Sequence, residues 1–325
     1  MRIYFWKKKS WRLWAFMGLV LLAFSIVGCG RKERYQDQFT DVFDTASMVI
    51  GYEESEKAFQ EKSTLVHETL LHYHKLFDVY TDYPDGKVNI AYGAVLSLWH
   101  EKREAGIANP ENASLPDAKD LEEAAKHCNI EDLILDEESM TVFFKDPYLR
   151  LDVGGIAKGW AVEKAAELLE KAGGKAYLLN IGGNLRAIGK KGDGAKWVCP
   201  VQNPFYIDGT EEEPYAVSGE IEDVSLVTSG DYERYFTVDG VRYAHIVDPE
   251  TKYPANLHRS VTILTKDSGI ADALSTALFI LSVEDGKELL EKMRREYAIE
   301  IEAMWVEPDH GMEYTEHFLK KVGAE

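Results

Sequence analysis

Cysteine and positive charge are both scarce in this chain of 325 residues. Its 3 cysteines are too few for a small disulfide scaffold, and no CxxC pair indicates a zinc site. Lysine and arginine number 37 against 56 aspartates and glutamates, giving a formal net charge of −19. Because nucleic-acid binding needs clustered basic residues, this balance argues against a nucleic-acid partner. Internal repeats and low-complexity tracts are absent as well, and a hydrophobic content of 45% supports a sizeable folded core.

The N-terminus differs from the acidic remainder. Residues 1–28 contain basic side chains and no acidic one. An apolar stretch over residues 13–27 follows the basic part and ends at Gly28. It is shorter than the ~20 residues that a membrane-spanning helix needs. A basic start, a short apolar core and a small residue at its end predict a secretory signal peptide.

Residues 26–29 (IVGC) also resemble a bacterial lipobox, in which the cysteine becomes the first mature residue and carries lipid. We therefore expect a lipoprotein signal peptide over 1–28, lipidation at Cys29, a polar tether over 29–38 and one main domain over 39–325. The alternative is an uncleaved N-terminal anchor. Either interpretation predicts an exported body anchored to the outer face of the bacterial cytoplasmic membrane, on the periplasmic side in a Gram-negative cell.

Cys128 and Cys199 remain in the body of the chain. One disulfide between them is possible in an oxidising compartment. Two buried, unpaired cysteines are the preferred interpretation, since free cysteine behaves as a small apolar residue.

Helices and strands alternate irregularly along the body. Apolar spacing predicts helices and strands without strict βαβ repetition, so we expect an α+β fold with mixed or antiparallel sheets. The length suits one large domain or two intimately associated lobes. The expected helices cover 56–77, 88–103, 120–127, 160–172 and 270–281. The expected strands and hairpins cover 39–52, 134–144, 176–181, the two sides of Asp239-Gly240, and 261–265.

A glycine-rich stretch, residues 154–159 (GGIAKG), opens the helix expected at 160–172. Glycines allow close approach of a ligand to the backbone, and first-turn amides favour an anion. Lys158 adds a point charge suited to phosphate. The stretch is neither a Walker A loop nor a GxGxxG fingerprint, so an ordinary turn with a solvated lysine is an equally good interpretation.

Asp272 and Thr276 stand four residues apart on a helix that is otherwise almost wholly apolar. This spacing places both side chains on one face. A carboxylate in such a helix is seldom buried without a partner, and two hard oxygens suit Mg²⁺. The alternative is that Asp272 lies near the N-terminus of this helix and is stabilised by its dipole, with the Thr276 hydroxyl bonded to a carbonyl one turn back.

Three further positions are open to two interpretations. Residues 180–184 (NIGGN) and 228–231 (TSGD) each end an apolar strand and suit either a ligand loop or an ordinary turn. His245 follows in an apolar strand and could be a general acid or base, or a core histidine with satisfied hydrogen bonds.

Taken together, these segments resemble one family. The segments in order are 152–159 (DVGGIAKG), 180–183 (NIGG), 228–235 (TSGDYERY), 245–249 (HIVDP) and 271–276 (ADALST). Their order and spacing closely resemble the ApbE family of FAD:protein FMN transferases, and the resemblance extends over about 39–305. It implies an ApbE-like fold and a Mg²⁺-dependent enzyme. Such an enzyme transfers the FMN moiety of FAD to a Thr or Ser hydroxyl of a target protein and releases AMP.

The resemblance also implies residue roles. It makes His245 the candidate catalytic acid or base. The implied metal site consists of Asp272, Thr276, a backbone oxygen of Gly155 and help from Ser275. The implied FAD contacts are Met48, Ala91, Tyr92, Gly93, Asp152, Lys158, Gly182, Gly183, Thr228 and Ile246. The implied partners are extracytoplasmic redox proteins bearing a flavinylation Thr or Ser.

The chain departs from the family pattern at two places. Met48 is followed by Val-Ile where the family has Gly-Thr, and the stretch over residues 82–88 is much shorter than in family members. Two alternatives to the transferase stay open, the first because it uses the same site chemistry and the second because of the shortened stretch. One is an FAD pyrophosphatase, in which water replaces the protein hydroxyl, and the other is a flavin-binding lipoprotein without catalysis.

Overall fold

The computed structural model describes residues 32–43, 45–76, 88–136, 138–207 and 212–324. The predicted signal peptide, Cys29 and nearly all of the shortened stretch before Val88 lie outside these ranges. Within the described ranges, no helix is both long and apolar enough to span a membrane.

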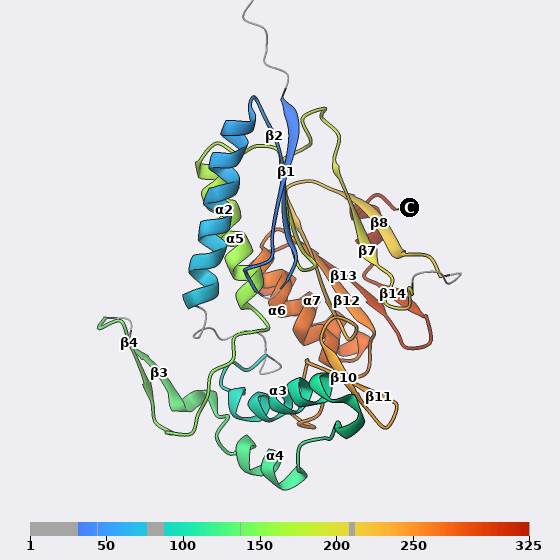
Figure 1. Ribbon diagram of the computed structural model, residues 1–325. Coiled ribbons are helices and arrows are strands. Elements are labelled where there is room, and N and C mark those ends of the chain that lie inside the picture. Colours follow the sequence, from blue (N-terminus) through green and yellow to red (C-terminus); the bar gives the residue numbers. More distant parts are fainter. Residues whose placement is uncertain (1–31, 44, 77–87, 137, 208–211, 325) are drawn as a thin grey trace, which may run out of the picture.

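An eight-stranded antiparallel sheet forms the centre of the protein (Figure 1). In spatial order, its strands are β1 (Glu33–Phe39), β2 (Ser47–Glu53), β5 (Tyr177–Ile181), β6 (Asn184–Ile188), β9 (Ser225–Gly230), β12 (Ser260–Thr265), β13 (Ile301–Val306) and β14 (Met312–Tyr314). Three hairpins form separate sheets: β3 (Leu133–Asp136) with β4 (Thr141–Phe144), β7 (Trp197–Gln202) with β8 (Tyr215–Ile221), and β10 (Tyr235–Val238) with β11 (Val241–Ala244). The predicted α+β class with antiparallel sheets is confirmed.

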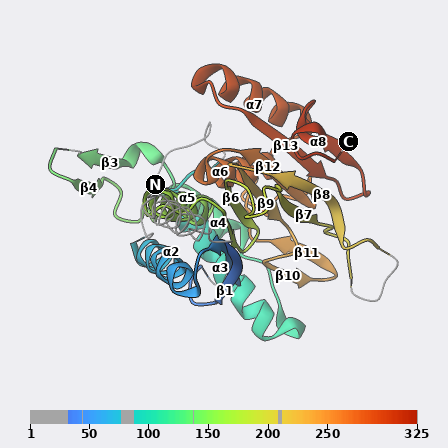
Figure 2. The same ribbon diagram turned by 90° about the horizontal axis from the view of Figure 1, so that it is seen from above.

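Helices cover one face of this sheet, as Figures 1 and 2 show. They are α2 (Glu56–Leu76), α5 (Ala157–Lys171), α6 (Ser268–Ile280) and α7 (Val283–Tyr297). The hairpin β7–β8 and the short α8 (Phe318–Lys321) pack on the other face. Strand β13 shows why two layers form: Ala303 and Trp305 point into the helical core, whereas Met304 points into the core beneath the hairpin. Alternate residues of a strand face opposite sides, so a strand buried throughout needs cover on both.

A smaller lobe lies beyond one end of the sheet (Figure 1). It contains α3 (Gly93–Ala108), the 3₁₀ turn η1 (Pro110–Asn112), α4 (Ala118–Ala125) and the hairpin β10–β11. Its own core includes Tyr92, Val95, Trp99 and Phe236. A second 3₁₀ turn, η2 (Ile130–Asp132), leads from α4 into the β3–β4 hairpin. The chain enters this lobe from β9 at β10 and returns from β11 to β12, so the two lobes are closely joined, as expected.

Element boundaries differ from the sequence-based expectation in several places. Most of the residues predicted as a tether over 29–38 belong to β1, which pairs along its whole length with β2. The helix expected at 88–103 begins five positions later and runs to Ala108. His245 lies just beyond β11 rather than within a strand. The hairpin turn at Asp239-Gly240 and the buried, unpaired state of both body cysteines are confirmed.

Candidate active site

A cavity of about 470 Å³ opens where the smaller lobe meets the sheet and helix α6. This volume lies within the range of ligand pockets, ~300–1,000 Å³. Its walls come from α3, the start of α5, the ends of β5 and β9, the segment after β11, and α6. Segments distant in sequence therefore meet at one place.

The N-terminus of α5 forms one wall of the cavity. Gly154, Gly155, Ala157 and Lys158 line it. The Lys158 ammonium donates a hydrogen bond to the Gly182 carbonyl at 3.0 Å, which holds its charge at the end of β5. Asp152 Oδ1 accepts from the Gly154 amide at 2.8 Å and fixes the loop before the helix. A helix N-terminus with an adjacent lysine favours an anionic group such as phosphate.

Asp272 lies on α6 and is only 5% exposed. Burial raises the pKa of this carboxyl above its ordinary value, and the charge of Lys158 and a bond from the Gly159 amide oppose that rise. Asp272 Oδ2 accepts from the Gly159 amide at 2.7 Å. The carboxylate therefore faces the first turn of α5, where the helix dipole stabilises negative charge. The alternative interpretation expected stabilisation by the dipole of Asp272's own helix. In the structure, the N-terminus that faces the carboxylate is that of α5.

Asp272 shares the cavity lining with two further residues that offer oxygen atoms, Thr276 and Gly155. The Thr276 hydroxyl lies 3.4 Å from the Gly155 carbonyl and 3.2 Å from the Asp272 carbonyl. The second contact is the bond that the alternative interpretation predicted. Gly155 and Thr276 are packed so closely that a Cβ on Gly155 would sit 3.3 Å from the Thr276 methyl. One carboxylate, one hydroxyl and one carbonyl are hard donors that fit Mg²⁺.

This donor set differs from a self-sufficient metal centre. Among the described residues, no group of three or more His, Cys, Asp or Glu side chains could hold a metal. A cation here would take its remaining ligands from phosphate oxygens and water, as Mg²⁺ commonly does. Ser275 is fully buried, and its hydroxyl contacts Ser229 at 2.8 Å and the Asp272 carbonyl at 2.9 Å, so it braces the site from behind.

Gly159 is required by the contact between α5 and α6. A Cβ there would lie 2.3 Å from the Ser268 carbonyl and 2.4 Å from Asp272 Cβ, both on α6. We expect Gly159→Ala to push the helices apart and to lower the free energy of unfolding by about 1–3 kcal/mol, as overpacking does. Thermal unfolding measures this, and Lys171→Ala on the exposed end of α5 should change it by less than about 0.5 kcal/mol. Equal stability of Gly159→Ala and the parent would contradict the contact.

His245 faces the cavity from the segment after β11. Its Nδ1 lies 3.2 Å from the Arg234 carbonyl and therefore carries the proton as donor, which leaves Nε2 as the acceptor. Burial and then the charges of Arg234 and Arg103 lower the pKa of His245 to about 4. The imidazole is thus neutral at physiological pH and can accept a proton through Nε2.

The turn after β5 brings backbone to the cavity edge. Gly182 and Gly183 have φ angles of +51° and +80°, a region that side chains disfavour. Thr45 Oγ1 would lie 2.2 Å from a Cβ on Gly182. The Gly183 carbonyl accepts from the Thr228 amide at 3.3 Å, which joins the ends of β5 and β9. Residues 180–184 therefore form a tight turn, and the same turn also lies at the edge of the cavity, so the turn and ligand-loop interpretations are compatible.

Ten of the residues named from the sequence line this cavity: Tyr92, Asp152, Gly155, Lys158, Gly182, Thr228, His245, Ile246, Asp272 and Thr276. Five do not: Met48, Ala91, Gly93, Gly183 and Ser275. The chain near Met48 reaches the cavity through Phe43 and Thr45 instead. Ala91 and Gly93 flank Tyr92 but pack inward, and Gly93 is pressed against the Arg150 carbonyl.

One face of α3 was missed by sequence reasoning. Leu96, Trp99, His100 and Arg103 all line the cavity. They stand at i, i+3, i+4 and i+7, so helical periodicity could have identified them as one face. Trp99 is held there by a hydrogen bond from its indole nitrogen to the Lys252 carbonyl at 2.8 Å.

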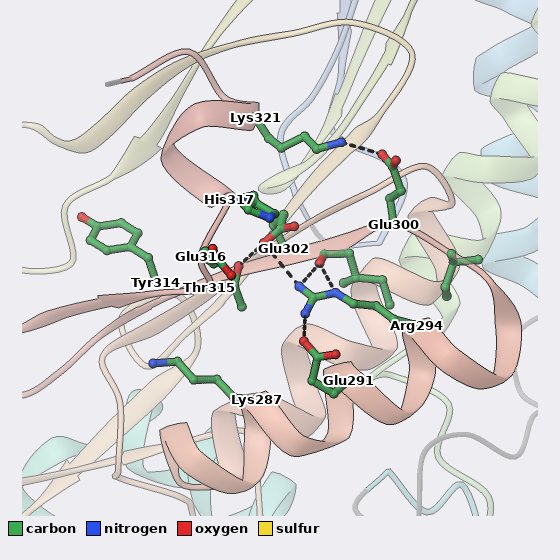
Figure 3. A pocket seen from close by; sticks show the side chains of 12 residues that line it. Lys287, Glu291, Arg294, Glu300, Glu302, Tyr314, Thr315, Glu316, His317 and Lys321 are labelled. Carbon is green, nitrogen blue, oxygen red and sulfur yellow. Dashed lines mark hydrogen bonds and ion pairs between the residues drawn. The ribbon is translucent and has the colours of Figure 1, made fainter.

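A hollow of about 710 Å³ between α7, β13 and α8 is larger but is not a comparable site (Figure 3). Its charged side chains neutralise one another: Arg294 pairs with Glu291 and Glu302, and Lys321 pairs with Glu300 at 2.6 Å. These pairs engage both basic side chains, whereas Lys158 in the candidate cavity bonds to a carbonyl, and the hollow lies outside the segments that carry the sequence motifs.

Comparison with known proteins agrees with this geometry. The family model described as the ApbE family matches residues 34–301. An FAD:protein FMN transferase of Haemophilus influenzae is 35% identical over 214 residues, covering 64% of this chain and 59% of that protein. One from Treponema pallidum is 34% identical over 251 residues, covering 73% and 65%. The chain thus matches less than two thirds of the length of these relatives.

Solved structures show the same fold. The crystal structure of the ApbE protein from Thermotoga maritima has a TM-score of 0.73 and 25% identity, covering 89% of this chain and 99% of that one. The flavin transferase ApbE from Vibrio cholerae has a TM-score of 0.66 and 24% identity, covering 87% and 97%. The fold and the cavity define an α+β protein with a candidate phosphate and cation site. The family match is more specific: this chain belongs to the ApbE family.

Proposed function

We propose that this protein transfers the FMN moiety of FAD to a Thr or Ser hydroxyl of a target protein and releases AMP. The supporting observation is that one cavity is lined by the α5 N-terminus with Lys158, by the oxygens of Asp272 and Thr276, and by His245. The names of the relatives from Haemophilus influenzae and Treponema pallidum support the choice of reaction.

The chain's own residues account for each requirement of that reaction. Lys158 and the α5 amides would hold the pyrophosphate. Asp272, Thr276 and the Gly155 carbonyl would hold Mg²⁺, which neutralises charge on the transferring phosphoryl group. His245 Nε2 would take the proton from the acceptor hydroxyl as its oxygen attacks the FMN phosphorus. The bond from that phosphorus to the bridging oxygen breaks, and AMP leaves with the bridging oxygen.

The direct test uses the acceptor as a variable. The protein is incubated with FAD, Mg²⁺ and a fragment of a target redox protein, and AMP release and covalent flavin fluorescence in a gel are followed. AMP together with labelled fragment supports the transferase. AMP without label indicates the FAD pyrophosphatase, and bound FAD with neither product indicates a flavin-binding lipoprotein.

We further infer that the protein is exported and anchored by lipid at Cys29, facing extracytoplasmic redox partners. The support is the basic, apolar and Gly-Cys pattern of residues 1–29.

Cys29→Ser is expected to move the protein from the membrane fraction to the soluble exported fraction or to leave it unprocessed. Immunoblots of fractionated cells measure this, with Cys128→Ser as the matched control that should stay with the membrane. Membrane retention and normal processing of Cys29→Ser would exclude the lipid anchor.

A further inference from the structure

A line of buried polar groups connects α5, β6 and α6 behind the candidate cation site. Arg186 on β6 is 3% exposed and donates from Nε to Glu163 Oε2 at 3.1 Å. The same carboxylate oxygen accepts from the Ser268 amide, in the first turn of α6, at 2.9 Å. Because a buried ion pair with a further donor holds its partners rigidly, this line fixes the start of α6 against α5.

Asn184 continues this line toward Asp272. It is fully buried, and its Oδ1 accepts from the Ser268 hydroxyl at 2.5 Å. Its Nδ2 has no hydrogen-bond partner among the described residues. That nitrogen lies 3.1 Å from the position of a Cβ on Gly159, and Asp272 Cβ lies 2.4 Å from the same point. The unpaired donor and the carboxylate thus adjoin the same glycine.

An unpaired amide in the interior is unfavourable unless it gains a partner in another state of the molecule. Two acceptors adjoin that glycine, the Ser268 carbonyl and the Asp272 carboxylate, and Asp272 Oδ2 already bonds to the Gly159 amide. The Ser268 carbonyl lies in the first turn of α6, where it can accept from the helix itself, which leaves the carboxylate as the acceptor with free capacity. Carboxylates that bind metal ions are commonly held by hydrogen bonds from outer residues, which set their orientation. Other buried polar atoms also lack a partner among the described residues, and Asn184 Nδ2 is distinguished from them because it adjoins Gly159 beside Asp272.

We propose that Asn184 is a positioning residue for the cation site. Its Oδ1 ties it to Ser268, and its Nδ2 donates to the Asp272 carboxylate when that group binds a divalent cation with Thr276 and Gly155. This inference rests on the cation site of the proposed function. It adds to that site a residue that contacts neither FAD nor the cation directly.

The test measures cation binding rather than turnover. The purified whole chain is titrated with Mn²⁺ in the presence of FAD, and free Mn²⁺ is followed by electron paramagnetic resonance. We expect Asn184→Ala to raise the Mn²⁺ dissociation constant by about 10–100-fold, the usual effect of losing an outer-sphere partner. FAD affinity in EDTA, measured by flavin fluorescence, should stay unchanged. An unchanged Mn²⁺ dissociation constant would overturn the proposal.

Two further variants separate positioning from folding. Ser268→Ala keeps the backbone bond to Glu163 and removes only the tether to Asn184, so it should weaken Mn²⁺ binding in the same direction. If Asn184→Ala does not fold, the Mn²⁺ affinity of Ser268→Ala decides whether Asn184 positions the cation site. Asn203→Ala is the matched control, because Asn203 is a buried, bonded asparagine beside β7–β8. It should lower the melting temperature without changing Mn²⁺ affinity.

The possible outcomes also separate this inference from the proposed function. If the parent protein binds no Mn²⁺ with FAD present, the cation site itself fails. If the parent binds Mn²⁺ and both Asn184→Ala and Ser268→Ala bind it equally well, only the role of Asn184 fails. If Asn203→Ala weakens Mn²⁺ binding as much as Asn184→Ala, general destabilisation explains the effect and the proposal is overturned.

Discussion

Asp272→Asn is expected to abolish cation-dependent turnover of FAD while preserving the fold. Asp272 is the single carboxylate among the three residues that would hold the cation. The metal is expected to contribute several kcal/mol of transition-state stabilisation. A loss of about 4 kcal/mol corresponds to a rate about a thousandfold lower. AMP release from FAD at saturating Mg²⁺ measures this.

Asparagine is preferred to alanine because of the Gly159 amide. The Asp272 carboxylate accepts from that amide in a buried position, and the asparagine carbonyl can do the same. Alanine would leave the amide unpaired, at a cost of about 1–3 kcal/mol in the free energy of unfolding. We therefore expect the melting temperature of Asp272→Asn to exceed that of Asp272→Ala, with both inactive.

A readout that does not depend on turnover completes this test. Mg²⁺ with FAD should raise the melting temperature of the parent, because a ligand that binds only the folded state stabilises it. The same addition should act on Asp272→Asn only as strongly as FAD alone. Full turnover in Asp272→Asn, or a normal stabilisation by Mg²⁺, would remove this residue from the cation site.

The sequence predicts the local elements of this fold better than their arrangement. The helix over Ala157–Lys171 and the turn at Asp239-Gly240 follow from spacing and turn chemistry within a few neighbouring residues. Strand β1 was missed because its residues are polar and mostly exposed, and only pairing with β2 orders them. An edge strand of this kind has little local signal.

The same division holds for the candidate site. Asp272, Thr276 and Lys158 stand out because a charge or hydroxyl on an apolar helix, or beside glycines, is locally unusual. Asn184 could be noted only as part of a turn, since its significance depends on Ser268 and Gly159 from two other elements. Tertiary contacts between segments about a hundred residues apart leave no periodic trace in one sequence.

The acidic composition also has a different meaning in three dimensions. The net charge of −19 argues against nucleic acid, yet three basic side chains, Lys158, Arg103 and Arg234, line the cavity beside the acidic Asp152, Glu233 and Asp272. The charges of the cavity lining balance overall, and a pyrophosphate would be favoured locally, where Lys158 and the amides of the α5 N-terminus lie. Net charge therefore constrains the partners of the outer surface more than the ligand of the cavity.

His245→Ala is expected to slow transfer to the acceptor by about 10²–10⁴-fold, the usual contribution of a general base. FAD affinity measured in EDTA should change far less, because the role of the imidazole is to accept a proton from the hydroxyl. His245→Gln serves as a bulkier control that retains a polar side chain without basicity. Equal losses of transfer and of FAD affinity would make His245 a binding residue instead.

The pH dependence gives this role a second and independent test. Burial and the neighbouring arginines lower the pKa of His245 to about 4, against about 6.5 for an ordinary histidine. A base must be unprotonated to act, so activity should fall only as pH drops through about 4 and should be flat between about 6 and 8. His245→Ala should lose this acidic limb.

Arg234→Met should shift the limb to higher pH, because removing a neighbouring positive charge makes the imidazolium easier to form. An acidic limb near 6.5 in the parent, or one unchanged in His245→Ala, would assign the proton transfer to another group.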